Sequence, residues 1–164
     1  MKKYYRDVLE IAGAFAVAFL FYQFLIVITG TQLPIVSVVS DSMYHRDYFD
    51  DWWSSSGSFY DKHDITKQDF MSFTNFNGLS RGDLLFVVKP VNLHVGDIII
   101  YQRDSSAMTI VHRVIETQGD KVVTKGDNNP DSDQPISLGN VQGRVVFAVP
   151  VLGYPRYLLH VMGI

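Results

Sequence analysis

The sequence predicts a mainly β protein in which a partly closed β-sheet domain follows an N-terminal transmembrane helix. Residues 11–28 form one apolar run in which Gln23 is the only clearly polar member. A helix rises ~1.5 Å per residue, so this run approaches the ~30 Å hydrocarbon core of a bilayer. From residue 81 onward, short runs rich in Val and Ile alternate with Gly-Asp turn signals, as is typical of a sheet with several short strands.

The apolar run is interpreted as a permanent anchor. A domain of this size does not need a core helix that is apolar on every side. A cleavable signal peptide would share the flanking charges, but the run is long and Thr29-Gly30-Thr31 is a poor cleavage site. Lys2, Lys3 and Arg6 precede the run, and no Lys or Arg follows it before Arg46. The positive-inside rule therefore places the N-terminus in the cytoplasm and the rest of the chain outside it.

The chain divides into three parts on this reading. Residues 1–30 form the cytoplasmic N-terminus and the anchor, residues 31–151 the extracytoplasmic β-rich domain, and residues 152–164 a short apolar segment that lies at the membrane surface or against a partner. The expected strands are residues 35–39, 84–88, 97–101, 110–115, 121–124 and 141–149. Residues 44–79 differ in character, and we expect them to be an inserted surface element with its own small structure, including a short helix capped near residues 64–67.

Composition excludes several classes of function. The formal net charge is −3, and no basic patch is interleaved with aromatic residues, so nucleic acid is not an expected partner. The chain has no cysteine, which excludes disulfides, thiolate nucleophiles and zinc–thiolate sites. No cofactor is expected.

Ser42 and His112 are the candidate nucleophile and base. Serine proteolysis needs a nucleophile, a base, a group that orients the base, and donors for the oxyanion. Ser42 directly follows a predicted strand and lies only a dozen residues beyond the anchor. His112 is a polar residue among β-branched neighbours in another predicted strand. A turn serine and a structural histidine are the plainer interpretations of the same residues.

Residues 125–133 form a loop dense in carboxylates that must be balanced by a cation or by hydrogen-bond donors. Asp127, Asn129, Asp131 and Asp133 alternate like the ligands of a calcium loop. The sixth position, Ser132, is not Gly, and the twelfth, Leu138, is not Glu, so we expect no metal here.

Five motifs together resemble type I signal peptidases, specifically the archaeal and endoplasmic-reticulum branch. They are Ser40-Asp41-Ser42-Met43, Arg81-Gly82-Asp83, Gly96-Asp97, Val111-His112-Arg113-Val114 and Lys125-Gly126-Asp127-Asn128-Asn129, with a further aspartate at Asp133. The resemblance implies that Ser42 is the nucleophile and that His112 replaces the lysine of bacterial members. It also implies that Asp133 is the third member, that Asp127 supports the site and that Ser40 donates to the oxyanion.

The same resemblance implies a membrane-bound serine endopeptidase that removes signal peptides after small-residue, Ala-X-Ala-like sites. The implied partners are signal peptides of secretory preproteins, the lipid bilayer and the secretion machinery. The implied location is the cell membrane, and an archaeal source fits best. Three alternatives remain open: a self-cleaving regulator with a Ser-Lys dyad, a non-enzymatic anchored binding protein, and an accessory subunit of a secretion complex.

The chain departs from the family pattern in two places. Tyr44-His45-Arg46 stands where members commonly have a proline soon after the Ser-Met pair, and residues 44–79 separate that pair from Arg81-Gly82-Asp83. Trp52, Trp53 and their aromatic neighbours in the insertion either dip into the lipid interface or form a small satellite core.

Overall fold

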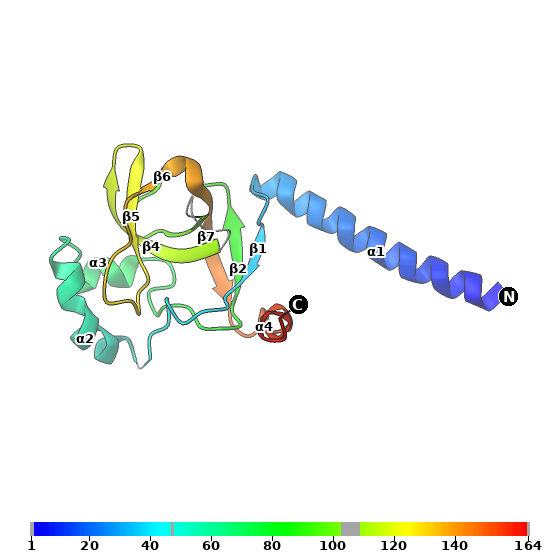
Figure 1. Ribbon diagram of the computed structural model, residues 1–164, viewed down its shortest axis with the longest axis horizontal. Coiled ribbons are helices and arrows are strands. Elements are labelled where there is room, and N and C mark those ends of the chain that lie inside the picture. Colours follow the sequence, from blue (N-terminus) through cyan, green and yellow to red (C-terminus); the bar gives the residue numbers. More distant parts are fainter. Residues whose placement is uncertain (1, 47, 103–108, 164) are drawn as a thin grey trace.

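The computed structural model describes residues 2–46, 48–102 and 109–163. Helix α1 (Lys2–Thr29) projects away from the rest of the molecule as a single long rod (Figure 1). Its side chains are almost all exposed, although the segment is strongly apolar. Within the described residues it is the one helix long and apolar enough to cross a membrane. An apolar surface of this extent needs a nonaqueous environment, which agrees with the predicted anchor.

A seven-stranded antiparallel sheet forms the body of the domain. Its strands are β1 (Ile35–Ser37), β2 (Leu84–Val88), β3 (Ile98–Gln102), β4 (Thr109–Gln118), β5 (Lys121–Lys125), β6 (Ile136–Ser137) and β7 (Val141–Val149). They lie in the order β1-β2-β7-β3-β4-β5-β6. Register shifts interrupt the β2–β7, β3–β7 and β4–β5 pairings. Such bulges increase the local twist and bend a sheet. The mainly β fold with an N-terminal apolar helix is therefore confirmed.

The insertion contains two helices, α2 (Phe49–Asp61) and α3 (Lys67–Ser72). The short helix α3 was predicted, and Thr66 caps it in a capping box with Asp69. Helix α2 was not predicted, because the Ser-Ser-Ser-Gly stretch at residues 54–57 looks like a chain break in sequence. Burial of one side of α2 stabilises the helix in spite of these residues.

The insertion covers one face of the sheet. Trp52, Tyr60 and Phe70 are buried together with Ile115 of β4 and Val123 of β5. Figure 1 shows α2 and α3 lying beside the β4–β5 end of the sheet. The insertion therefore has its own helices and a satellite core, as one of the two alternatives expected, and this core also includes side chains of β4 and β5. Because Trp52 and Tyr60 are buried in this cluster, their rings are not exposed for insertion into lipid.

Helix α4 (Tyr154–Val161) follows the last strand and was not foreseen as a helix. The chain reaches it through Gly153, whose N–H donates to the Gly82 carbonyl (2.8 Å) and whose carbonyl accepts from Ser37 Oγ (2.8 Å). A Cβ at Gly153 would lie 2.6 Å from both the Asp83 carbonyl oxygen and Ser37 Oγ, so the close approach requires glycine. The helix leaves a group of apolar side chains exposed: Leu158, Leu159 and Val161.

Phe70→Ala tests whether the insertion is an integral part of the domain. The Phe70 side chain is fully buried between Trp52, Tyr60 and the Arg113 guanidinium. Removing a buried phenyl ring costs about 3–5 kcal/mol of unfolding free energy. We expect this loss in denaturant unfolding. The neighbouring substitution Met71→Ala, at an exposed side chain, should change stability by less than about 0.5 kcal/mol. Equal effects of the two substitutions would contradict the packing described.

Candidate active site

Ser42 lies in a tight turn between β1 and the insertion. The Tyr44 N–H closes the turn on the Asp41 carbonyl (3.0 Å), and Met43 anchors it by burying its side chain in the core beneath the sheet. The Asn128 N–H donates to the Ser42 carbonyl (2.8 Å), and the Asn128 side-chain amide donates to the Asp41 carbonyl (3.1 Å). The turn is therefore held from both sides, while the Ser42 side chain itself stays partly exposed.

His112 is buried on β4, where it pairs with Asp133. Its Nδ1 lies 2.6 Å from Asp133 Oδ2. The same oxygen accepts hydrogen bonds from the Tyr101 hydroxyl (3.0 Å) and from Thr124 Oγ1 (2.8 Å). Burial raises the pKa of Asp133, but the hydrogen bonds, first of all that to His112, lower it more, so the pKa ends below its usual value. An ionised carboxylate only accepts hydrogen bonds, which assigns the proton to Nδ1 and leaves the lone pair on Nε2.

The His112 Nε2 atom and the Ser42 carbonyl oxygen both border the space above Gly126. A Cβ built on Gly126 would lie 2.7 Å from the Ser42 carbonyl oxygen and 2.8 Å from His112 Nε2. Real Cβ atoms do not approach other atoms this closely, so a side chain here would push the histidine and the serine turn apart. Glycine is required at position 126 because a side chain would fill this space. Its φ is not positive, so the backbone conformation itself does not require glycine.

Ser40 is the exposed neighbour of the same turn. Its Oγ lies 3.2 Å from Ser42 Oγ. The two hydroxyls are thus on the same side of the turn, and the Ser40 hydroxyl is within reach of an oxygen that develops charge beside Ser42.

Asp127 does not contact His112 but forms the centre of a buried ion pair. Arg113 holds it with two hydrogen bonds, from Nε to Oδ1 (3.0 Å) and from Nη2 to Oδ2 (2.8 Å). His45 Nε2 also lies 3.1 Å from Oδ2, and the Tyr60 hydroxyl donates to Oδ1 (3.1 Å). The Asp127 side chain thus bonds to β4 and to the insertion.

Electrostatics keep Asp127 ionised. Burial raises its pKa, but Arg113 and His45 lower it more, so the pKa lies well below the ordinary carboxyl value. A depressed pKa means that the ionised form contributes stability above the unfolded-state pKa. This contribution is lost as the pH falls through the native value.

The two faces of the β4–β5 pair carry different groups. His112 and Thr124 share one face, and Arg113 and Lys125 share the other, because neighbouring strand residues point to opposite sides and Arg113 pairs with Lys125. Burial lowers the pKa of Lys125 to about 8. Its Nζ donates to the carbonyls of Gly126 and Asp127 and lies over the Phe59 and Tyr60 rings. The lysine is thus engaged on the face opposite His112.

The acidic loop does not gather its carboxylates into one cation site. Asp127 turns to Arg113, Asp133 turns to His112, and Asp131 is exposed. Within the described ranges, no group of three or more His, Asp or Glu side chains has the arrangement of a metal site.

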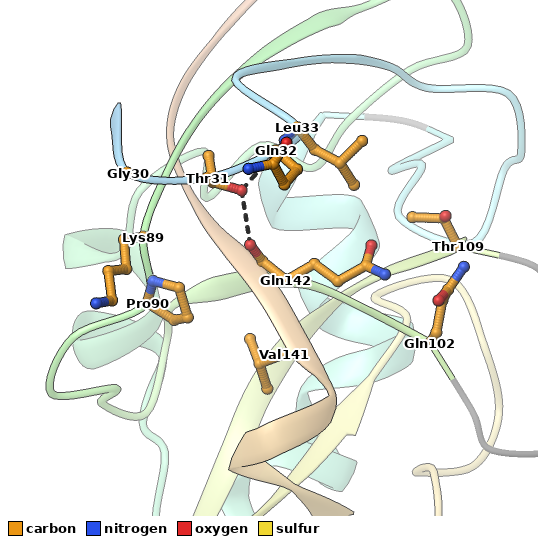
Figure 2. A pocket seen from close by; sticks show the side chains of 10 residues that line it. All are labelled: Gly30, Thr31, Gln32, Leu33, Lys89, Pro90, Gln102, Thr109, Val141 and Gln142. Atoms are coloured by element: carbon orange, nitrogen blue, oxygen red, sulfur yellow. Dashed lines mark hydrogen bonds between the residues drawn. The ribbon is translucent and has the colours of Figure 1, made fainter. Parts of the chain in front are cut away.

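A separate cavity lies where α1 meets the sheet. Gln102, Thr109 and Gln142 line it, and Thr31 donates from Oγ1 to the Gln142 carbonyl (2.8 Å) (Figure 2). Ser42 and His112, which the structure also describes, are not part of its lining. This cavity is therefore distinct from the candidate active site.

The structure adds residues that sequence reasoning missed. Tyr101 and Thr124 bind the Asp133 carboxylate, Arg113 binds Asp127, and Gly126 leaves the space between His112 and Ser42. Only Arg113 and Gly126 carried a sequence signal, since both stand inside the quoted motifs.

Gly126→Ala tests the space between the serine turn and the histidine. We expect preprotein cleavage to fall about 100-fold or more, because misplacement of reacting groups by about 1 Å has effects of this size. Gly139→Ala is the matched control, since its new Cβ would meet its nearest neighbour, Ser137 Oγ, only at 3.8 Å. Cleavage by Gly126→Ala within a few-fold of wild type would show that these groups do not act together.

The three aspartates of the loop should respond differently to replacement by asparagine. Asp133→Asn should retain the fold but stabilise the wrong histidine tautomer, a change that costs ~10⁴ in rate in a well-studied serine protease. Asp127→Asn should lower the cleavage rate, because Asp127 holds the loop, and should destabilise the protein by about 3–5 kcal/mol, because it leaves the Arg113 charge buried and unpaired. Asp131→Asn should be nearly silent. Cleavage rates and melting temperatures of the three variants distinguish these roles. A fast Asp133→Asn enzyme beside a stable but inactive Asp127→Asn enzyme would show that Asp127, and not Asp133, orients His112.

No protein-family model matches the chain, but comparison with known proteins finds several similar to it. A "Signal peptidase complex catalytic subunit SEC11" from Lachancea thermotolerans is 30% identical over 89% of this chain and 77% of its own length. The protein of the same name from Eremothecium gossypii is 32% identical over 88% and 76%. The human "Signal peptidase complex catalytic subunit SEC11C" is 29% identical over 99% and 81%. On the strength of this similarity, which extends over nearly the whole chain, the protein belongs to the SEC11 family of signal peptidase catalytic subunits.

Proposed function

We propose that this protein is a membrane-bound serine endopeptidase that removes N-terminal signal peptides from secretory preproteins after small-residue, Ala-X-Ala-like sites. The observation that carries the proposal is the His112–Asp133 pair, whose Nε2 borders the same space above Gly126 as the Ser42 carbonyl oxygen. Membership in a family of signal peptidase catalytic subunits supports the same activity.

Ser42 is the nucleophile in this proposal. Its Oγ attacks the carbonyl carbon of the scissile bond while His112 Nε2 takes the hydroxyl proton. Asp133 stabilises the resulting imidazolium and keeps the proton of Nδ1 in place. The tetrahedral oxyanion accepts hydrogen bonds from the Ser42 N–H and the Ser40 hydroxyl. His112 then gives its proton to the leaving amine, and a water molecule, activated in the same way, hydrolyses the acyl-enzyme.

The bilayer accounts for the choice of substrate. The apolar part of a signal peptide lies in the membrane, and its cleavage site emerges just above the surface. A protease anchored by α1 meets that site at a high effective concentration. We propose that the N-terminus is cytoplasmic and that the sheet domain lies outside the cytoplasm, because Lys2, Lys3 and Arg6 precede the anchor.

Helix α4 supports a position close to the membrane. In Figure 1 it is seen end-on while α1 is seen along its length, so α4 runs across the direction of the anchor. It lies near the end of the domain from which α1 leaves. Its exposed Leu158, Leu159 and Val161 would rest in the interface of the bilayer that α1 crosses. The membrane in this proposal is the cell membrane of an archaeon, and the secretion machinery is the expected neighbour of the enzyme.

Ser42→Ala tests the proposal. We expect processing of a preprotein in membranes or detergent to fall below about a thousandth of wild type, with insertion and melting temperature unchanged. Ser58→Ala, at an exposed serine of the insertion, is the control and should process normally. Activity of Ser42→Ala above about a hundredth of wild type would refute the assignment. Wild-type protein without any cleavage would favour the alternative of an anchored binding protein or accessory subunit.

A further inference from the structure

The two oxygens of Asp127 receive four contacts from nitrogen or hydroxyl groups, and two of these groups belong to the insertion. Arg113 contacts both oxygens, His45 Nε2 lies 3.1 Å from Oδ2, and the Tyr60 hydroxyl donates to Oδ1 at 3.1 Å. The exposed fractions of the His45 and Tyr60 residues are 6% and 0%, so neither contact competes with bulk water.

Asp127 stands between the two residues that shape the candidate active site. Gly126 on one side leaves the space that His112 Nε2 and the Ser42 carbonyl oxygen both border. Asn128 on the other side donates its backbone N–H to the Ser42 carbonyl (2.8 Å). Contacts that fix the Asp127 side chain therefore also restrain the backbone of Gly126 and Asn128, which borders both His112 Nε2 and the Ser42 turn.

His45 is also connected to Ser42 through the residues at which the insertion begins and ends. It lies three residues after Ser42, and the chain between them is fixed where the Leu79 N–H donates to the Met43 carbonyl (2.8 Å). A Cβ at Gly78, whose φ is +78°, would lie 2.6 Å from His45 Cδ2 and 2.4 Å from the Met43 carbonyl oxygen. The two ends of the insertion thus lie close together beside the His45 imidazole.

Charge neutralisation alone does not explain the contacts of His45 and Tyr60 with Asp127, because Arg113 already supplies the counter-charge of this carboxylate. Burial and the Asp127 charge raise the pKa of Tyr60 far above its usual value, so the phenol remains a hydrogen-bond donor. The His45 ring stacks on Trp52 with centroids 3.7 Å apart. Its Nδ1 is buried without a hydrogen-bond partner in the described part of the chain. Leaving a buried nitrogen without a hydrogen-bond partner costs folding free energy. The His45 ring nevertheless lies in the orientation that places its Nε2 against Asp127.

We propose that His45 and Tyr60 are positioning residues for peptide-bond cleavage, through which the insertion sets the orientation of Asp127 and so the spacing of Ser42 and His112. The inference rests on the proposed function. On this proposal residues 44–79 contribute to the cleavage rate. They do so only by orienting Asp127.

The test uses full-length protein in detergent, with kcat and KM for a signal-peptide substrate and the melting temperature measured for each variant. Tyr60→Phe removes only the hydroxyl. His45→Phe keeps a ring to stack on Trp52 but removes the nitrogen at Asp127, and His45→Gln retains a donor at the position of Nε2. The matched controls are Tyr48→Phe, at an exposed tyrosine of the insertion, and His63→Gln, at a histidine that packs on Phe59.

We expect Tyr60→Phe and His45→Phe to lower kcat about 10- to 100-fold while KM changes less than twofold, because spacing affects the transition state and not substrate binding. His45→Gln should recover part of the loss, and the controls should match wild type. In an Asp127→Asn background, Tyr60→Phe should have no further effect on kcat.

Two results would overturn the inference. One is a wild-type kcat for Tyr60→Phe and His45→Phe, measured well below their melting temperatures, whether or not those temperatures fall. The other is an undiminished effect of Tyr60→Phe in the Asp127→Asn background. Either result leaves Ser42-dependent cleavage by the wild type intact. Failure of the proposed function itself would instead appear as cleavage that survives Ser42→Ala.

Discussion

The buried ion pair between Asp127 and Arg113 is the interaction on which the rest of the structure depends. A carboxylate with an exposed fraction of 1% needs a counter-charge and a full set of hydrogen bonds, because a lone buried charge is strongly destabilising. The pair joins β4 to the end of β5. Its remaining hydrogen-bonding positions are filled by His45 and Tyr60, which draws the insertion onto the sheet. One electrostatic requirement thus connects three parts of the chain that are distant in sequence.

The alternation of side chains along β4 and β5 places the His112–Asp133 pair and the Arg113–Asp127 pair on opposite faces. His112 faces Asp133 and Thr124 on one side, where its Nε2 borders the space beside the Ser42 turn. Arg113 and Lys125 face the aromatic side chains of the insertion on the other side, where their charges lie over the rings of Phe70 and Tyr60. Adjacent residues of β4 thus serve both sides, because side chains of neighbouring strand residues point to opposite faces.

Local patterns in the sequence were sufficient to predict the anchor and most strands. The purity of residues 11–28 and the β-branched runs after residue 81 are properties of neighbouring residues. The contact between His112 and Asp133 was foreseen through a family resemblance. Helix α2 and the partners of Asp127 were not foreseen, because burial against β4 and β5 stabilises α2, and His45 meets Asp127 across 82 positions of sequence. No periodicity of the chain encodes such a contact.

The most direct test of the central claim, that Ser42 is activated by His112, uses the absence of cysteine from the chain. Ser42→Cys creates a single thiol, and its rate of alkylation by iodoacetamide at neutral pH reports how strongly a neighbouring base activates it. Ser58→Cys supplies an exposed reference thiol. The account predicts that Cys substituted at residue 42 reacts faster than the reference and that adding His112→Ala abolishes the difference. A thiol at residue 42 that reacts no faster than the reference, or whose rate is indifferent to His112→Ala, would contradict it.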